Sequence, residues 1–228
     1  MKNFLFDLYG TLIDVHTDEE SAEFWTDIAA MLGADDPARL RERFHALCRA
    51  ERPEGAETQF ADIFTVLLEE YGSKEEMLSF ARRFRERSLC KLRLFDGAIT
   101  LLEGLRARGA GVYLLSNAQA CFTRRELETL GLTEKFDGIL LSSEVGWKKP
   151  CKKFFLAAFE KFSLSPEDSI YIGNDLRDDV GGAREVGMRS VYIETEQSGR
   201  YENPPPADLQ AESYPKLISM LFRLAEEK

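Results

Sequence analysis

The stretch that decides the fold is Phe4-Leu5-Phe6-Asp7-Leu8-Tyr9-Gly10-Thr11-Leu12, close to the start of the chain. Its first three residues are apolar, which is typical of a strand buried on both faces of a sheet. Asp7 ends the strand, and Gly10-Thr11 follows within a few residues. A carboxylate at the end of a buried strand is a candidate nucleophile, because carboxylates are ionised at neutral pH and can accept a transferred group. Aspartate also caps turns after strands, but the Gly-Thr pair favours the functional interpretation.

The composition indicates one medium-sized domain, or a core domain with a large insertion. The 228 residues are 44% hydrophobic and 11% aromatic, which is enough for a packed core. The formal net charge of −10 argues against a basic surface that would bind nucleic acids. The chain enters the motif-bearing strand directly and has no apolar run of membrane-spanning length, so we expect a cytoplasmic protein with no cleaved targeting segment and no membrane partner. The four cysteines are scattered without a CxxC pair, and we expect them to be reduced.

Two parts of the chain differ in their hydrophobic pattern. From about residue 17 to residue 90, apolar residues recur at helical spacing in segments that Gly and Pro breakers separate. These segments cover residues 24–32, 40–48, 60–71 and 77–84. We therefore predict an all-α helical cap of residues 16–91. It would be inserted after the first strand, into a core of residues 1–15 and 92–228.

The remainder of the chain alternates short apolar runs with helical segments. The runs cover residues 112–115, 138–141, 169–172 and 190–193. Helical spacing covers residues 120–130, 152–162, 178–186 and 217–225. Short buried strands joined by helices form parallel sheets, so we predict an α/β fold with a doubly wound, Rossmann-like parallel sheet that includes the first strand.

Polar residues follow the predicted strands. In an open parallel sheet, ligands bind beyond the carboxyl ends of the strands, so these residues are expected to gather at one edge. They are Asp7, Ser116, Asn117, Ser142, Ser143, the turn Lys148-Lys149-Pro150, Asn174, Asp175, Asp178 and Asp179.

Four short motifs resemble, in order, those of the haloacid dehalogenase (HAD) superfamily of hydrolases, in the class with a helical cap inserted after the first strand. They are Asp7-Leu8-Tyr9-Gly10-Thr11-Leu12, Leu114-Leu115-Ser116-Asn117, Trp147-Lys148-Lys149-Pro150 and Gly173-Asn174-Asp175-Leu176-Arg177-Asp178-Asp179-Val180. Each motif alone is weak, but four in the right order at strand ends are specific. The resemblance covers essentially the whole chain.

The resemblance implies that Asp7 is the nucleophile and that Thr11 belongs to the catalytic residues of the same motif. Ser116 and Asn117 would hold the transferred oxygens by hydrogen bonds. A Ser-Asn pair at the start of a helix is otherwise a common N-cap, so this role depends on the other motifs.

A lysine would neutralise the anionic group at this site. The resemblance selects Lys149 over Lys148, because a proline follows Lys149. Asp179 would orient Lys149 and metal-bound water, or would itself be a second metal ligand.

The acidic fourth motif predicts a bound cation. Close carboxylates repel by about 4 kcal/mol per pair at a moderate effective dielectric constant, and oxygen ligands beside a phosphate favour Mg²⁺. The resemblance implies that the ligands are the Asp7 carboxylate, the backbone carbonyl of Tyr9 and Asp175. Asn174 is the alternative to Asp175, which we prefer for its charge.

Tyr9 departs from the phosphatases of this family, which carry an aspartate there as general acid and base. Such a group contributes roughly 10² to 10⁴ in rate, and a phenol with a pKa of about 10 is a poor base near neutrality. Tyrosine at this position resembles the 2-haloacid dehalogenases, in which the aspartate attacks carbon without a metal. Those enzymes hold their substrate with an arginine early in the cap, and its flanking pattern is missing around the arginines of the second predicted helix, which we expect to form a solvated face. They are Arg39, Arg41, Arg43 and Arg49.

We therefore predict a Mg²⁺-dependent hydrolase of small phosphate monoesters or phosphoanhydrides that works through a phospho-aspartyl intermediate on Asp7. Tyr9 would have an altered proton-transfer role, and good leaving groups would be favoured. The partner would be a small phosphorylated metabolite, and the protein would be a monomer or homodimer. The alternatives are a metal-independent 2-haloacid dehalogenase that uses Asp7, and a catalytically weakened binding module. His16, Phe24 and Trp25 are candidates for substrate contacts in the cap, with core packing or surface exposure as the alternative for each.

Overall fold

Six parallel strands form the sheet in the computed structural model, which describes residues 2–227. Their order is β5-β4-β1-β6-β7-β8. The bounds are β1 (Asn3–Phe6), β4 (Gly111–Ser116), β5 (Gly138–Leu141), β6 (Ser169–Gly173), β7 (Arg189–Ile193) and β8 (Leu209–Ala211). The chain runs outward from β1 to β4 and β5, and then crosses to β6 on the other side of β1. This arrangement confirms the predicted doubly wound α/β sheet, to which β8 adds a short edge strand that the sequence did not indicate.

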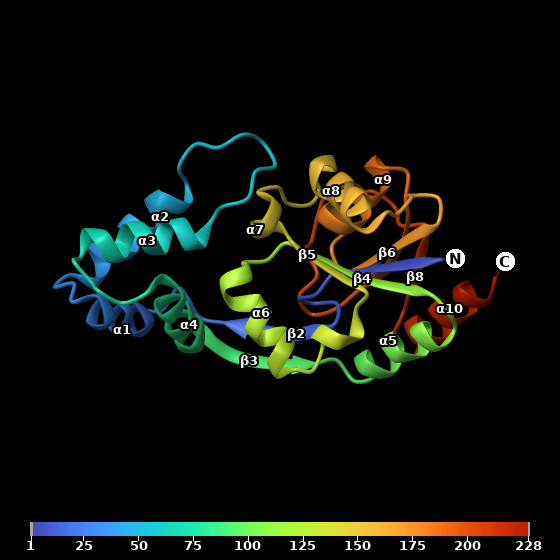
Figure 1. The fold of residues 1–228 in the computed structure, drawn as a ribbon, viewed down its shortest axis with the longest axis horizontal. Coiled ribbons are helices and arrows are strands. Elements are labelled where there is room, and N and C mark those ends of the chain that lie inside the picture. Colours follow the sequence, from blue (N-terminus) through green and yellow to red (C-terminus); the bar gives the residue numbers. More distant parts are fainter. Residues whose placement is uncertain (1, 228) are drawn as a thin grey trace.

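Helices cover both faces of the sheet (Figure 1). One face packs against α5 (Ala98–Ala107), α6 (Ala120–Thr129) and α10 (Tyr214–Glu226), and the other against α8 (Lys152–Phe162) and α9 (Gly182–Glu185). Because side chains alternate along a strand, Phe4 and Phe6 of β1 enter the first of these cores and Leu5 enters the second. Both sides of β1 are thus buried, which is why its sequence is continuously apolar.

A helical insertion separates β1 from the rest of the sheet. It starts and ends in a two-stranded antiparallel ribbon of β2 (Ile13–Thr17) and β3 (Leu89–Leu94). The helices between these strands are α1 (Ala22–Leu32), α2 (Pro37–Cys48), α3 (Phe60–Glu70) and α4 (Met77–Ser88). The ribbon has charged residues at several positions, so the hydrophobic pattern did not indicate it. The predicted boundaries at residues 16 and 91 fall inside this ribbon, and the division into core and cap domains stays a prediction.

Local signals set the ends of the insertion's helices. The Ser21 side chain accepts a hydrogen bond from the backbone N–H of Phe24 at 3.2 Å, and α1 ends at Gly33 in the left-handed conformation (φ 71°). Asp36 caps α2 and is followed by Pro37 at the first helical position.

Aromatic side chains form the core of the insertion. Phe24 and Trp25 are each only 2% exposed and pack edge to face against one another, with ring centroids 5.3 Å apart. Both are therefore packing residues of this core, which is the alternative that the sequence left open for them. His16 lies on the exposed part of β2. Phe122 of α6 enters the same core and joins the insertion to the sheet layer.

The predicted helix at 178–186 is divided in two. One π-helical segment, η2 (Leu176–Gly181), leads directly into the short α9. Two other short elements, η1 (Thr133–Lys135) and α7 (Ser142–Val145), connect the core strands and helices.

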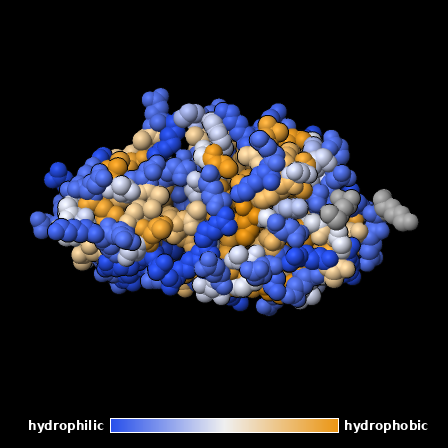
Figure 2. Space-filling view, in the orientation of Figure 1, coloured by the Kyte–Doolittle hydropathy of each residue, from blue (hydrophilic) through white to orange (hydrophobic). Residues whose placement is uncertain are grey.

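Figure 2 shows apolar patches separated by hydrophilic side chains. Within residues 2–227, no helix has the length and apolarity that crossing a bilayer requires, and the four cysteines are free.

Candidate active site

Asp7 lies at the centre of the carboxyl edge of the sheet. It directly follows β1, and its backbone N–H donates to the carbonyl of Ile172 in β6 at 2.9 Å. The strand order reverses here, because β4 and β6 flank β1, and ligands of open α/β sheets bind at such a point. Gly10 completes the turn with φ 82°, and a Cβ there would lie 2.3 Å from Nδ2 of Asn174. Glycine is therefore required by both the backbone conformation and the close approach.

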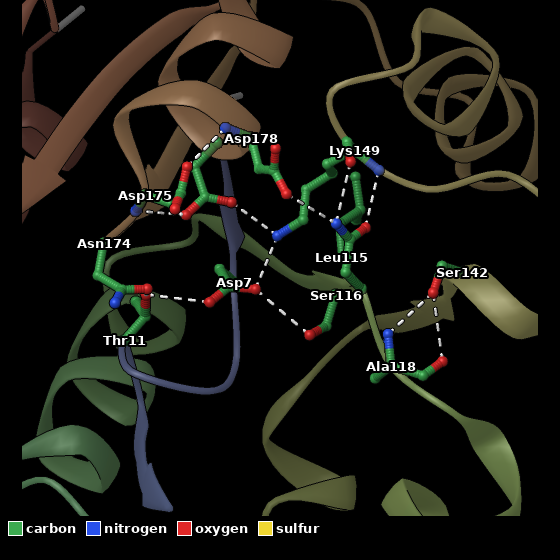
Figure 3. A network of polar contacts seen from close by, with 12 residues as sticks. Asp7, Thr11, Leu115, Ser116, Ala118, Ser142, Lys149, Asn174, Asp175 and Asp178 are labelled. Atoms are coloured by element: carbon green, nitrogen blue, oxygen red, sulfur yellow. Dashed lines mark hydrogen bonds and ion pairs between the residues drawn. The ribbon is translucent and has the colours of Figure 1, made fainter. Parts of the chain in front are cut away.

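Three side chains from separate segments surround the Asp7 carboxylate (Figure 3). Lys149 Nζ donates to Asp7 Oδ1 at 2.7 Å, and Ser116 Oγ donates to the same oxygen at 3.3 Å. Thr11 Oγ1 lies 3.2 Å from Asp7 Oδ2. Four residues that the sequence predicted for the site therefore meet, and Asp7 itself is only 7% exposed.

Lys149 is the cation of the site and is 2% exposed. Its ammonium group donates to Asp7 and Asp179, both at 2.7 Å, and to the hydroxyl of Tyr171 at 2.8 Å. Burial disfavours the charged form, but the two carboxylates outweigh burial and hold the pKa of Lys149 well above its usual range. Lys149 is thus a permanently charged group that faces Asp7.

Tyr171 is a site residue that the sequence did not indicate. It lies inside the apolar run of β6, where an aromatic residue is typical of core packing. Its hydroxyl donates to the carbonyl of Leu115 at 2.7 Å and accepts a hydrogen bond from Lys149. Tyr171 therefore fixes the third donor direction of the ammonium group.

Asp179 holds Lys149 from the side opposite Asp7. Its Oδ1 accepts from Lys149, and its Oδ2 accepts from the backbone N–H of Asp175 at 2.9 Å. Burial raises the pKa of Asp179, and Lys149 opposes this rise. Of its two predicted roles, this geometry favours orienting Lys149, because each carboxylate oxygen already accepts a hydrogen bond.

Asn117 braces the loop that carries Lys149. Its Oδ1 accepts from the backbone N–H of Lys149 at 2.7 Å, and its Nδ2 donates to the Lys149 carbonyl at 3.0 Å. Nδ2 also lies 3.3 Å from a carboxylate oxygen of Asp178. The Asn117 amide is thus bonded at both ends, and its contact with the transferred oxygens stays a prediction. Ser116 alone contacts the Asp7 carboxylate from this motif.

Asp175 is occupied as a helix cap. Its Oδ1 accepts from the backbone N–H groups of Arg177 and Asp178, at 2.9 and 2.7 Å. Its Oδ2 accepts from the hydroxyl of Tyr201 at 2.5 Å. These bonds tie the carboxylate to η2 and to the loop after β7.

Asn174, rather than Asp175, reaches the atoms around Asp7. Its Oδ1 lies 3.2 Å from Thr11 Oγ1, which is also 3.2 Å from Asp7 Oδ2. Its Nδ2 donates to Thr195 Oγ1 at 3.2 Å, so the amide oxygen is directed toward Thr11 (Figure 3). The choice between Asp175 and Asn174 as metal ligand stays a prediction, and this geometry favours Asn174 because capping turns the Asp175 carboxylate toward η2.

The residues present suit a magnesium site with few protein ligands. Asp7 Oδ2 and Asn174 Oδ1 converge on the Thr11 hydroxyl, and both are the oxygen donors that Mg²⁺ prefers. Among residues 2–227 no group of three or more His, Cys, Asp or Glu side chains is placed so that it could hold a metal ion by itself. Mg²⁺ commonly keeps several waters and takes only one or two carboxylates, so one carboxylate and one amide fit this ion.

Tyr9 is bonded away from Asp7. Its hydroxyl donates to Glu126 Oε2 at 2.5 Å and lies 2.9 Å from Thr123 Oγ1, both on α6. Glu126 Oε1 in turn accepts from Arg85 Nε at 2.6 Å, and Arg85 lies over the Tyr9 ring at 5.7 Å from its centroid. Arg85 belongs to α4, so this contact joins the helical insertion to the core.

This network changes the expected role of Tyr9. Burial, together with the negative charge of Glu126, raises the pKa of Tyr9 far above its ordinary value. The phenolic proton is therefore directed to Glu126 and away from Asp7, and the raised pKa makes Tyr9 a weaker acid than an exposed tyrosine. Sequence patterns gave no sign of Glu126 or Arg85, because single charged residues on helices are usually solvated.

The site opens into a cavity of about 190 Å³ with a strongly polar lining. Its lining residues are Asp7, Tyr9, Ser116, Asn117, Lys149, Asn174, Asp175, Asp178, Asp179 and Gln197. The arginines of α2 lie elsewhere. Arg41 is half-buried and Arg43 is exposed, and they pair with Glu20 and Glu70 on the surface of the insertion. This agrees with the solvated face that the sequence predicted for them.

Comparison with known proteins places these features in context. A family model described as haloacid dehalogenase-like hydrolase matches residues 1–187. A phosphoserine phosphatase from Thermus thermophilus is 34% identical over 134 residues, which span 58% of this chain and 53% of that protein. A glyceraldehyde 3-phosphate phosphatase from Methanothermobacter thermautotrophicus is 26% identical over 86% of this chain and 87% of its own length.

The fold is also found in solved structures. A 2-haloacid dehalogenase from Pseudomonas syringae pathovar tomato superposes with a TM-score of 0.68 over 98% of this chain and all of its own, at 22% identity. At this identity the likeness concerns the fold and leaves the reaction open. The named activities of the related proteins thus include phosphate-ester cleavage and dehalogenation on the same architecture.

Proposed function

Because the chain belongs to the haloacid dehalogenase-like hydrolases, we propose that it cleaves small phosphate monoesters or phosphoanhydrides. The observation that carries this proposal is the Asp7 carboxylate, held at the end of β1 against the charged Lys149 ammonium. A buried cation beside a carboxylate nucleophile suits a substrate whose transferred group is itself anionic.

The proposed reaction has two steps. An Asp7 oxygen attacks phosphorus, the phosphorus–oxygen bond to the leaving group breaks, and the phosphoryl group is transferred to the carboxylate. Water then attacks the acyl phosphate, which releases inorganic phosphate and regenerates Asp7. Lys149 neutralises the phosphoryl oxygens in both steps, and Ser116 donates a hydrogen bond to them.

Mg²⁺ would be held by Asp7, Asn174 and the backbone carbonyl of Tyr9. When bound, it would reduce the negative charge that the phosphate and Asp7 bring together. The remaining work falls to the chain itself: Asp179 and Tyr171 keep Lys149 in place, and Asn117 keeps its loop in place.

The leaving group would receive little help from Tyr9. Its hydroxyl proton is committed to Glu126, so substrates whose leaving groups need no protonation are favoured. These are acyl phosphates, aryl phosphates and diphosphates. The relatives named as phosphoserine and glyceraldehyde 3-phosphate phosphatases support a small phosphorylated metabolite as the substrate.

A dehalogenase is the second candidate. Tyr9 matches the tyrosine that the 2-haloacid dehalogenases carry at this position, and a site with only one carboxylate among its possible metal donors also suits a reaction that needs no metal. Against it, Arg41 and Arg43 face away from the site in surface ion pairs. Within the described part of the chain, no arginine lines the cavity around Asp7.

The deciding experiment measures phosphate and halide release from one mixed panel of phosphate esters and 2-haloacids, with Mg²⁺ and with EDTA. We expect phosphate release that EDTA abolishes, that Asp7→Asn removes, and that is greater for aryl than for alkyl phosphates. Asn174→Asp should lower the Mg²⁺ concentration for half-maximal activity. Chloride release in EDTA would identify a dehalogenase, and phosphate binding without turnover of any substrate would identify a binding module.

A further inference from the structure

A second cavity of about 390 Å³ adjoins the catalytic pocket. The two share Asn117 and Asp178 as lining residues, so a molecule bound at Asp7 can extend from one into the other. The remaining lining residues are Cys48, Glu57, Thr58 and Phe60 from the helical insertion, and Ala118, Gln119 and Lys148 from the core. This volume suits a small organic group.

The wall from the insertion is tied firmly to the core. The loop of residues 49–59 forms a bridge between Ala56 and Trp147, in which Glu57 N–H donates to the Gly146 carbonyl at 2.9 Å. Lys148 N–H donates to the Gly55 carbonyl at 3.0 Å. A Cβ on Gly55 (φ 77°) would lie 2.7 Å from Cys151 Cβ, so the loop backbone packs closely against the core and only glycine fits at this position.

Most polar side chains of this cavity are already committed. Gln119 Oε1 accepts from Phe60 N–H at 3.0 Å, and its Nε2 donates to the Thr58 carbonyl at 2.7 Å. Glu57 accepts from the hydroxyl of Ser142 and from the backbone N–H of Thr58. These groups shape the wall and leave little capacity to bind a ligand.

Lys148 is the exception. It is the only positively charged residue that lines this cavity, and within residues 2–227 no carboxylate lies within 4.0 Å of its ammonium group. Lys149, the next residue, instead points into the catalytic pocket and is fully bonded. The two consecutive lysines therefore serve two adjoining cavities. Lys149 is paired with Asp7 and Asp179, whereas Lys148 makes no ion pair and interacts only at longer range with the Asp178 carboxylate, which lines the same cavity.

We propose that this cavity holds the leaving-group portion of the substrate and that Lys148 binds a second anionic group on it, either a carboxylate or a second phosphate. This inference rests on the proposed phosphatase function. An unpaired ammonium group in a partly enclosed site prefers an anion, because the surroundings weaken the attraction less than bulk water does. Lys148 is then a residue that determines specificity, while the chemistry stays with Asp7.

The test measures binding to the Asp7→Asn protein by calorimetry, so that no turnover is needed. The ligands are glycerol 3-phosphate, 3-phosphoglycerate and glycerol 1,3-bisphosphate, which differ in the group beyond the ester. We expect at least one of the two bis-anionic ligands to bind tenfold or more tightly than glycerol 3-phosphate. Which of them does so distinguishes a carboxylate site from a second phosphate site.

Adding Lys148→Met should remove this preference and leave the affinity for glycerol 3-phosphate within twofold. Lys148→Arg should retain the preference, and so should Lys152→Met, which alters an exposed lysine paired with Glu185. The inference would be overturned if all three ligands bound with equal affinity, or if Lys148→Met lowered the affinity for all three by the same factor. Phosphate release without any such preference would refute this inference alone, whereas absence of phosphate release in the panel above would refute the proposed function.

Discussion

Two buried polar networks include residues that follow β1 directly. In the first, the Lys149 cation is held between the carboxylates of Asp7 and Asp179. In the second, the Glu126 carboxylate is held between the Arg85 cation and the Tyr9 hydroxyl. Asp7 and Tyr9 are only two residues apart, yet their side chains belong to different networks.

The difference between the networks lies in what they connect. Every member of the first comes from the carboxyl edge of the sheet, and an excess of carboxylate faces the cavity that would hold a phosphate. The second joins α4 of the helical insertion to α6 of the core, and its cation and carboxylate neutralise one another. The comparison therefore assigns chemistry to the first network and positioning of the insertion to the second.

The largest effect is expected from Lys149→Met. It leaves two carboxylates buried without a counter-ion, so we expect phosphate release to fall by about 10³ or more and the free energy of unfolding to fall by about 3–5 kcal/mol. Steady-state kinetics and urea unfolding measure the two changes. Lys152→Met is the control, and retained activity in Lys149→Met would contradict the role of the first network.

An intermediate effect is expected from Glu126→Gln. Arg85 would lose its buried partner, and we expect a loss of about 2 kcal/mol in the free energy of unfolding, with activity reduced less than by Lys149→Met. The double variant Arg85→Met/Glu126→Gln should lose less than the sum of the single variants, because the two residues contact each other. Strictly additive losses, measured by urea unfolding, would show that the ion pair does not couple the insertion to the core.

The smallest effect is expected from Tyr9→Phe. The hydroxyl contacts with Glu126 and Thr123 are removed, so we expect a loss of about 1–2 kcal/mol in the free energy of unfolding. We expect kcat on alkyl phosphates to stay within about threefold of the original. If Tyr9 supplied the proton to the leaving group, the same change would lower kcat by roughly 10² or more. A kinetic comparison on one alkyl and one aryl phosphate separates the two outcomes.

The sequence by itself determined the sheet, its order of motifs and the position of the reacting groups. Continuous short apolar runs with helices between them admit few topologies, and residues that follow parallel strands must meet at one edge. For this reason Asp7, Ser116, Lys149 and Asp179 could be predicted to lie together, although they are far apart in the chain. The four helices of the insertion followed from their spacing in the same way.

Only the tertiary structure decided which way the side chains point. Asn174 and Asp175 are adjacent in sequence, and either side chain could supply an oxygen ligand. In the structure the Asp175 carboxylate caps η2, whereas the Asn174 amide oxygen lies beside Thr11. Glu126 lies 117 residues from Tyr9 in sequence, so no local pattern could indicate their hydrogen bond. Backbone position follows from local periodicity and topology, whereas side-chain direction depends on the hydrogen-bonding partners that packing brings from elsewhere in the chain.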